Sequence, residues 1–184
     1  MDYTSTHRDI VEECKQGNRQ AQFELYRLYA KSMFNVCLRM VGRESDAEDL
    51  LQNSFIDVFS KLHTFRYQSS IGAWIKRIVV NNCINFLKRK RIFFEDLGQV
   101  LDYDLAPETE ELSGSIDVEA IKRALFQLPD GYRAVFSLYS IEGYDHKEIA
   151  QILNVTEATS KSQYSRARKK LKELLKNKSL MSNL

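Results

Sequence analysis

The chain has 184 residues, enough for one large domain or two small ones, and its 43% apolar content is too high for a globally disordered protein. Only 2 prolines and 7 glycines occur, which favours long helices over the many turns of a β-rich fold. The net charge is only +2, and no apolar run approaches the roughly 20 residues of a transmembrane helix. Because acidic residues also stand where a signal peptide would place its apolar segment, we expect a cytoplasmic protein without membrane insertion.

Apolar residues recur at helical spacing through the first half of the chain. The pattern predicts a short helix at 10–14 that stops at Gly17, and then a long helix that ends at Gly42. A further helix is predicted to begin at Ser45, with Glu48 three residues later completing a capping box.

The next predicted helix, at about 71–91, has two unlike sides. One side is apolar, and the other carries cations and amides three or four residues apart: Arg77, Asn81, Asn85 and Lys88 or Arg89. Asparagine bonds to base edges and cations hold phosphates, so this side is typical of proteins that bind single-stranded or partly opened nucleic acid. The polar loop before it, 64–70, contains two aromatic residues and is predicted to receive a base swung out of the stack.

Charge is segregated along the chain. No acidic residue occurs from 58 to 94, no Lys or Arg from 92 to 121, and Glu173 is the only acid from 161 to 176. Two basic segments separated by an acidic one indicate two surfaces that face a polyanion and a spacer kept away from it. Solvated helix faces are the alternative. The acidic stretch 92–116 has weak periodicity and is predicted to be a linker.

Four shorter helices are predicted after the linker, near 117–127, 130–141, 145–153 and 156–176. The last two have the spacing of a helix-turn-helix, with Asn154 as the left-handed residue of the turn and Thr156 as the cap of the second helix. That second helix is predicted to present five residues to the major groove: Lys161, Ser162, Gln163, Ser165 and Arg166. An ordinary helical hairpin is the alternative.

These patterns together predict an all-α chain of two small helical domains, 1–91 and 117–184, joined by the acidic linker 92–116. The cysteines are odd in number and far apart, so we expect small buried apolar groups and no metal site: Cys14, Cys37 and Cys83. The histidines are isolated and no carboxylate pair has an acid–base partner. We therefore expect no cofactor, no small-molecule substrate and no enzymatic activity.

In this order the motifs resemble the sigma-70 family of bacterial RNA polymerase sigma factors, and within it the extracytoplasmic-function (ECF) group. The run DAEDLLQNSF at 46–55 resembles the motif that docks on the β′ clamp helices of the polymerase. The segment 65–81 is similar to the one that contacts and opens the promoter −10 element, and parts of 128–171 to the domain that binds the −35 element. A chain of this length has no room for the middle domain of larger family members, which is typical of the ECF group.

The resemblance implies partners and site residues. The partners are core RNA polymerase, through its β′ clamp helices and its β subunit, promoter DNA, and an anti-sigma factor. The polymerase contacts implied are Asp49, Gln52 and Asn53. The −10 contacts are Phe65, Arg66, Ser69, Trp74, Arg77, Asn81, Asn85 and Lys88, with core packing as the alternative role for Phe65 and Trp74. The −35 contacts are the five residues of the second helix of the helix-turn-helix, Lys161, Ser162, Gln163, Ser165 and Arg166. In the loop 64–70 the sequence departs from the family, because Tyr67 stands where the family commonly has Gly.

Two other functions stay open. A sigma mimic that binds an anti-sigma regulator without touching DNA would keep the docking faces and lose the stripe of cations and amides. A stand-alone repressor or activator would use the helix-turn-helix alone and would not need the 46–55 motif. If the chain is a sigma factor, the resemblance implies that the linker 92–116 passes through the polymerase as a mimic of nucleic acid, with a plain flexible spacer as the alternative.

Overall fold

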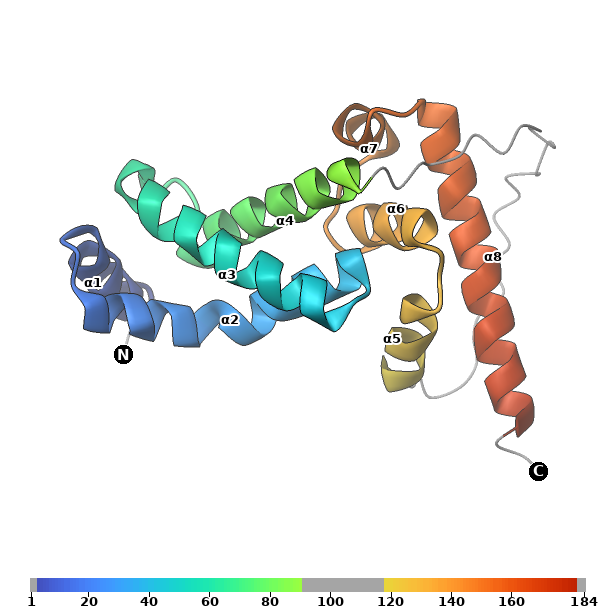
Figure 1. The fold of residues 1–184 in the computed structure, drawn as a ribbon, viewed down its shortest axis with the longest axis horizontal. Coiled ribbons are helices and arrows are strands. Elements are labelled where there is room, and N and C mark those ends of the chain that lie inside the picture. The colour runs from blue at the N-terminus through green and yellow to red at the C-terminus, as the bar shows by residue number, and fades with distance from the viewer. Residues whose placement is uncertain (1–2, 91–117, 182–184) are drawn as a thin grey trace. The chain divides into compact units, whose positions relative to one another are not determined.

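A computed structural model describes residues 3–90 and 118–181 of the chain (Figure 1). Most of these residues are helical and no strand occurs among them, so the prediction of an all-α chain is confirmed. They form an N-terminal unit and a C-terminal unit, one on each side of the break. The predicted acidic linker 92–116 lies outside the described residues. Within those two stretches, no helix has the length and apolar character needed to span a bilayer.

The N-terminal unit consists of four α-helices and one turn of 3-10 helix: α1 (Tyr3–Lys15), α2 (Arg19–Val41), α3 (Glu44–Lys61), η1 (Leu62–Thr64) and α4 (Ile71–Arg89). Each of α2, α3 and α4 packs against the other two, and α1 packs against α2 and η1. All three cysteines are buried in this unit, as predicted. Burial raises the pKa of the Cys14 thiol to about 11, so this cysteine is an unreactive apolar group.

The helix ends of this unit follow from single residues. Asn18 caps α2, because its side-chain oxygen accepts hydrogen bonds from two backbone N–H groups of the first turn (2.9 and 3.2 Å). Gly42 ends α2 with a φ of +76°, a left-handed conformation that glycine adopts without strain. The predicted capping box at Ser45 is wrong, since α3 already begins at Glu44 and the preceding residue makes no side-chain cap. The left-handed Gly42 lets α3 start almost at once, and carboxylates in its first turn stabilise the helix dipole.

The C-terminal unit consists of α5 (Val118–Phe126), α6 (Asp130–Ser140), α7 (His146–Leu153) and α8 (Glu157–Met181). The three short helices lie in succession along the long α8 (Figure 1). An apolar cluster joins α5 to α8 and is made of Ala124, Leu125, Leu128, Ala167 and Leu171. The helix α8 therefore supports the whole C-terminal unit.

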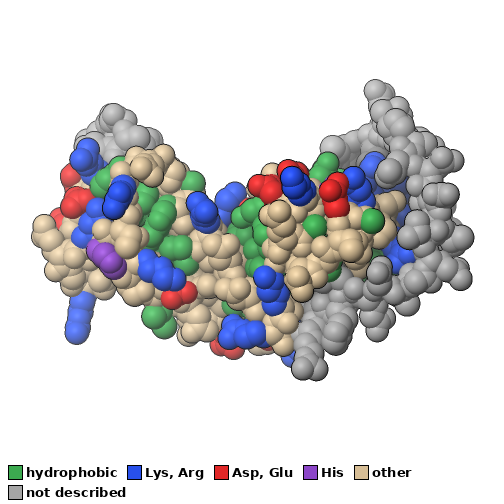
Figure 2. Space-filling view, turned by 90° about the horizontal axis from the view of Figure 1, so that it is seen from above, with side chains coloured by type: hydrophobic (Ala, Val, Ile, Leu, Met, Phe, Trp, Pro, Cys, Tyr) green, Lys and Arg blue, Asp and Glu red, His purple; other side chains and the backbone are tan. Residues whose placement is uncertain are grey.

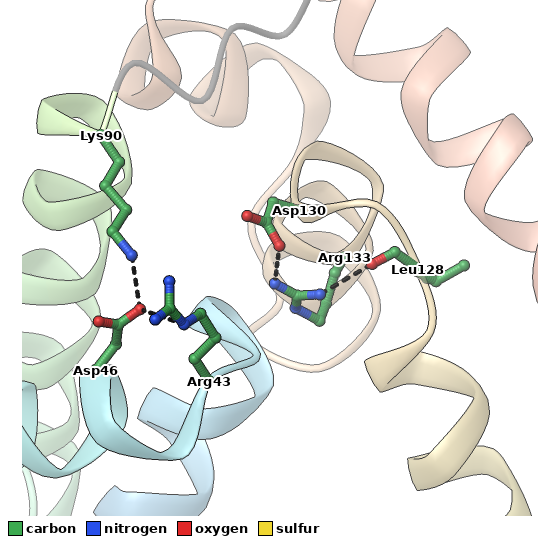
Figure 3. A network of polar contacts seen from close by, with 6 residues as sticks. All are labelled: Arg43, Asp46, Lys90, Leu128, Asp130 and Arg133. Atoms are coloured by element: carbon green, nitrogen blue, oxygen red, sulfur yellow. Dashed lines mark hydrogen bonds and ion pairs between the residues drawn. The ribbon is translucent and has the colours of Figure 1, made fainter.

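A buried arginine holds the turn between α5 and α6. Arg133 is 3% exposed, and its Nη1 donates to the carbonyl oxygen of Leu128 (2.9 Å). Its other terminal nitrogen pairs with Asp130 in the first turn of α6 (Figure 3). A buried guanidinium needs such partners, because an unpaired charge in the core costs several kcal/mol. Arg133 is therefore a structural residue.

The turn between α7 and α8 confirms the predicted helix-turn-helix. Asp145 and Glu148 form a capping box at the start of α7, with hydrogen bonds of 2.7 and 2.8 Å. Asn154 ends α7 in the left-handed conformation, with φ 57° and ψ 49°. The Thr156 hydroxyl then accepts a hydrogen bond from the N–H of Thr159 (3.0 Å) and caps α8.

The left-handed turn gives a first prediction. We expect Asn154→Ala to lower the free energy of unfolding of the C-terminal unit by about 1 kcal/mol, because alanine lacks the tolerance of asparagine for this conformation. Asn154→Gly is the matched control and should cost less, since glycine adopts positive φ freely. Urea unfolding followed by circular dichroism, with hydrogen exchange of α7 and α8 peptides, would measure both. Equal stability of the two variants would contradict the assigned turn.

Candidate nucleic-acid interface

The outer side of α4 carries a row of cations and amides. Its exposed members lie three or four residues apart, as predicted: Arg77, Asn81, Asn85 and Lys88. The opposite side of the helix lies in the core, where Ile75, Val79 and Leu87 are at most 1% exposed. Because that apolar side fixes the rotation of α4 about its axis, the four polar side chains are held toward solvent. Their contacts with DNA stay a prediction.

The loop before α4 is built on two aromatic rings. Phe65 is only 4% exposed, so its ring packs in the core of this structure, which favours the alternative role, and its contact with DNA stays a prediction. Its N–H donates to the carbonyl oxygen of Leu62 (3.0 Å), and this turn directs the ring inward, with its centroid 5.4 Å from that of Trp74. Trp74 is half-buried. Arg66 and Ser69 are exposed on the loop, as their predicted role requires.

A polar groove lies between α3 and α4, with a volume of about 660 Å³. Its polar lining comes from both helices: Asn53 and Asp57 from α3, and Asn82, Asn85, Lys88 and Arg89 from α4. The groove thus brings together Asn53, predicted to contact the polymerase, and Asn85 and Lys88, predicted to contact DNA. Amides and cations are the groups that hold base edges and phosphates.

Asn82 is a residue of this groove that sequence reasoning missed. Its side-chain nitrogen donates to Oδ2 of Asp57 (2.9 Å) and to Oγ of the buried Ser54 (3.2 Å). These bonds tie the middle of α4 to α3. The signal in the sequence was weak, because Asn82 lies between the apolar and the polar side of α4 and fits either.

The outer face of α3 carries the residues predicted to meet the polymerase. Asp49, Gln52 and Asn53 are all exposed. Ile56 is 66% exposed on the same face, four residues after Gln52 and three after Asn53. Sequence reasoning missed Ile56, although helical spacing alone would have placed it there. The face therefore has an apolar centre beside polar groups.

Asp46, the first residue of the 46–55 motif, stabilises the fold of the N-terminal unit. Its carboxylate pairs with Lys90 at the end of α4 (2.6 Å) and lies 3.7 Å from Nε of Arg43 (Figure 3). Only 17% of the Asp46 side chain is exposed. The start of α3 is therefore joined to the end of α4, which leaves the later residues of the motif to face outward.

The second helix of the helix-turn-helix, α8, presents fewer residues than predicted. Lys161 and Ser162 are exposed, and Ser165 and Arg166 are half-buried. Gln163 is only 5% exposed, so the prediction that it lies on the outer face is wrong. Gln163 lies three residues after the buried Ser160 and four residues before the buried Ala167. It is therefore on the side of α8 that packs on the rest of the unit. Among the described residues, its Oε1 has no hydrogen-bond partner.

His146 lies at the corner where α6, α7 and α8 meet. Its ring stacks on that of Tyr139, with centroids 4.3 Å apart, and its Nδ1 is 3.0 Å from Oγ of Ser160. Burial, and then the positive charge of Lys161, hold the pKa of His146 below its ordinary value, although two nearby carboxylates act in the opposite direction. The neutral ring is thus a packing group that fixes the first turns of α8.

Some of the basic side chains of the described residues stand beside acidic ones. On the face shown in Figure 2, Lys and Arg side chains are scattered among apolar and acidic ones. Several of them form ion pairs with nearby acids, such as Lys161 with Glu157 (2.7 Å). The cations on this face therefore suit separate contacts with phosphates.

Comparisons with known proteins match both units. Residues 25–92 match a family model described as Sigma-70 region 2, and residues 118–171 one described as Sigma-70, region 4. The chain is 33% identical over 164 residues to the ECF RNA polymerase sigma factor SigM of Mycobacterium tuberculosis, covering 86% of this chain and 79% of that protein. It is 26% identical over 179 residues to the ECF RNA polymerase sigma factor SigW of Bacillus subtilis, covering 91% and 95%.

A solved structure is also similar. It is the sigma factor RpoE in complex with the anti-sigma factor NepR from Bartonella quintana, with a TM-score of 0.49 and 25% identity. The match covers 83% of this chain and 95% of that one.

The inward position of Gln163 gives a second prediction. We expect Gln163→Met to raise the free energy of unfolding of the C-terminal unit by about 1 kcal/mol, because it removes a buried acceptor without a partner and keeps the volume. Binding to duplex promoter DNA should stay unchanged, as measured by fluorescence anisotropy. Ser162→Ala, at an exposed neighbouring position, is the control for stability. Weaker DNA binding by a Gln163→Met variant of unchanged stability would show that Gln163 contacts DNA after all.

Proposed function

Since the chain belongs to the sigma-70 family, among its ECF sigma factors, we propose that it binds core RNA polymerase and directs it to promoters through two separate DNA contacts. The N-terminal unit would capture unpaired bases of the −10 element. The C-terminal unit would read the −35 element as duplex. The observation that carries this proposal is the outer face of α4, where amides and cations stand in a row above a buried apolar side.

The chemistry of that face suits opened DNA. Asn81 and Asn85 each offer a donor and an acceptor to the edge of a base, while Arg77 and Lys88 can pair with phosphates on either side. Exposed asparagines add little to a helix, so their presence in register has a better explanation in binding than in folding. Capturing a base costs a few kcal/mol of lost stacking, and these contacts offset that cost.

The outer face of α3 is the proposed polymerase contact. Ile56 exposes most of its side chain to water, and burying it would favour association. Asp49, Gln52 and Asn53 would surround it with hydrogen-bonding groups. An apolar centre with a polar rim is the usual anatomy of a protein–protein interface.

In the C-terminal unit, the proposed −35 contacts are Lys161, Ser162, Ser165 and Arg166 on α8. A helix of this kind enters the major groove with its first turns, where lysine and arginine reach guanine edges or phosphates and serine reaches either. Thr156 and the left-handed Asn154 support this proposal, because they set the angle at which α8 leaves the turn.

We also propose an anti-sigma regulator as a partner. A protein that holds a sigma factor inactive has to cover the surface that docks on the polymerase, and Ile56 gives that surface an apolar anchor. The proposed function places the protein in the cytoplasm with the polymerase, and it requires no catalytic group.

The third prediction tests the α4 face. We expect the double variant Asn81→Ala, Asn85→Ala to slow promoter opening by about tenfold or more, because it removes the groups that bond to unpaired bases. Affinity for core polymerase should be unchanged. The measurements are 2-aminopurine fluorescence at the −10 element and a binding titration with core enzyme. Asn35→Ala, an exposed asparagine on α2, is the matched control. Unchanged opening by the double variant would contradict the proposed role of α4.

The fourth prediction tests the α3 face. Ile56→Asp should weaken binding to core polymerase by about tenfold, because it puts a charge at the apolar centre of the interface. Ile56→Leu should keep the wild-type affinity, and neither change should lower the melting temperature, since the side chain is exposed. A wild-type chain that binds promoter duplex but not the polymerase would point to a stand-alone regulator. One that binds neither DNA nor the polymerase would point to a sigma mimic.

A further inference from the structure

Tyr67, in the loop between η1 and α4, has an unusual backbone conformation. Its φ is +58°, in the left-handed region that glycine favours and bulky side chains avoid. Asn154 is the only other non-glycine residue with a positive φ in the described stretches, and its place at the end of α7 explains it. No helix ends at Tyr67. Contacts of its side chain must therefore hold the backbone in this conformation.

Apart from the Phe65 ring of the same loop, the contacts of the Tyr67 side chain come from α1. The Tyr67 hydroxyl donates to Oε1 of Glu12 at 2.5 Å. The guanidinium of Arg8 lies 5.0 Å from the centre of the tyrosine ring, and Nζ of Lys15 lies 4.7 Å from it, both within the range of cation–π attraction. Lys15 also donates to the same carboxylate oxygen of Glu12 (2.9 Å). Three side chains of one helix thus hold a single aromatic residue.

A second attachment lies two residues earlier in the loop. Nζ of Lys15 donates to the carbonyl oxygen of Phe65 at 3.3 Å. The Phe65 ring in turn lies between Tyr67 and Trp74, with centroid distances of 4.8 and 5.4 Å. A continuous series of contacts therefore runs from α1 through the loop to the first turn of α4.

The hydrogen bond between Tyr67 and Glu12 persists across the physiological pH range. The bond from Tyr67, and then the one from Lys15, hold the pKa of Glu12 below its ordinary value. Burial, and then the bond to Glu12, raise the pKa of Tyr67 to about 12. Near neutral pH the tyrosine thus keeps its proton and the carboxylate keeps its charge. The protonation states that this hydrogen bond requires are therefore present near neutral pH.

We propose that Tyr67 is a positioning residue, which ties the 65–70 loop to α1 so that Arg66 and Ser69 face an unpaired base in one fixed orientation. This inference rests on the proposed function, since it concerns the loop that the sequence predicts to receive a base when the N-terminal unit captures the −10 element. The hydroxyl and the ring of Tyr67 are both engaged by α1, so the residue acts by holding the loop and not by stacking on the base. By this route α1 takes part in base selection without touching DNA.

The test compares variants that break the same contact from its two ends. Tyr67→Phe keeps the ring and removes the hydroxyl, and Glu12→Ala removes the acceptor. Tyr29→Phe is the matched control, because it removes a tyrosine hydroxyl that bonds to His7 on α1 (2.8 Å) and does not belong to the loop. Tyr67→Gly relaxes the left-handed backbone, so a loss in this variant reports missing contacts and not a strained loop.

Two measurements follow the loop. In the free chain, acrylamide quenching of Trp74, the only tryptophan, should increase in Tyr67→Phe and Glu12→Ala and stay unchanged in Tyr29→Phe. In the polymerase complex, promoter opening is measured with each of the four bases at each −10 position. We expect the preference for the best base at one position to fall about fivefold in either variant, as for the loss of one hydrogen bond. The double variant should fall no further, because both changes remove the same bond.

The possible outcomes are distinct. A merely structural role would lower the melting temperature and slow opening on all sequences equally, with the base preference kept, and this would overturn the proposal. If Tyr67→Phe keeps the wild-type base preference and Tyr67→Gly loses it, the proposal is also overturned. That result would favour stacking of the tyrosine ring on the base. If the wild-type chain opens no promoter with the polymerase, the proposed function fails and this inference fails with it. Normal opening with an unchanged preference in the variants defeats the inference alone.

Discussion

The burial of one side of α4 against α2 and α3 determines where the functional groups of the N-terminal unit point. Ile75, Val79 and Leu87 are withdrawn from water, and each large aliphatic side chain buried in this way contributes about 1.5–3 kcal/mol. A rotation of α4 by one residue would expose them, so the helix has one stable orientation. Asn81 and Asn85 are therefore presented to solvent by the core beneath them and need no partner of their own.

Polar contacts between α3 and α4 add to the apolar packing of these two helices. Two such contacts oppose sliding of one helix along the other. Asn82 bonds to Asp57 and Ser54 near the middle, and Asp46 pairs with Lys90 at one end. The groove between the helices keeps its width as a result, so the proposed polymerase face and the proposed DNA face share one framework.

The sequence was sufficient for the helices, for the polar side of α4 and for the turn at Asn154, because spacing and single turn residues determine them locally. The sequence-based prediction failed where the position of a side chain depends on packing that its residue type does not reveal. Phe65 and Gln163 carry groups suited to DNA, yet a turn after η1 directs the first into the core and the packing side of α8 buries the second. Ile56 was missed for a different reason, since helical spacing places it beside Gln52 and Asn53 but an isoleucine is expected to be buried. The attachment of Tyr67 to α1 joins residues 55 positions apart, and no local pattern reveals it.

An inward Gln163 also bears on how the two proposed DNA contacts would share the recognition of a promoter. A helix in the major groove distinguishes base pairs through the side chains that reach their edges, and if α8 binds there as proposed, it has one such side chain fewer than its sequence suggests. The proposed duplex contact would then be less selective, and more of the selectivity would come from the proposed contacts with unpaired bases. Mutations that change which promoters are recognised would then be expected mainly in the N-terminal unit.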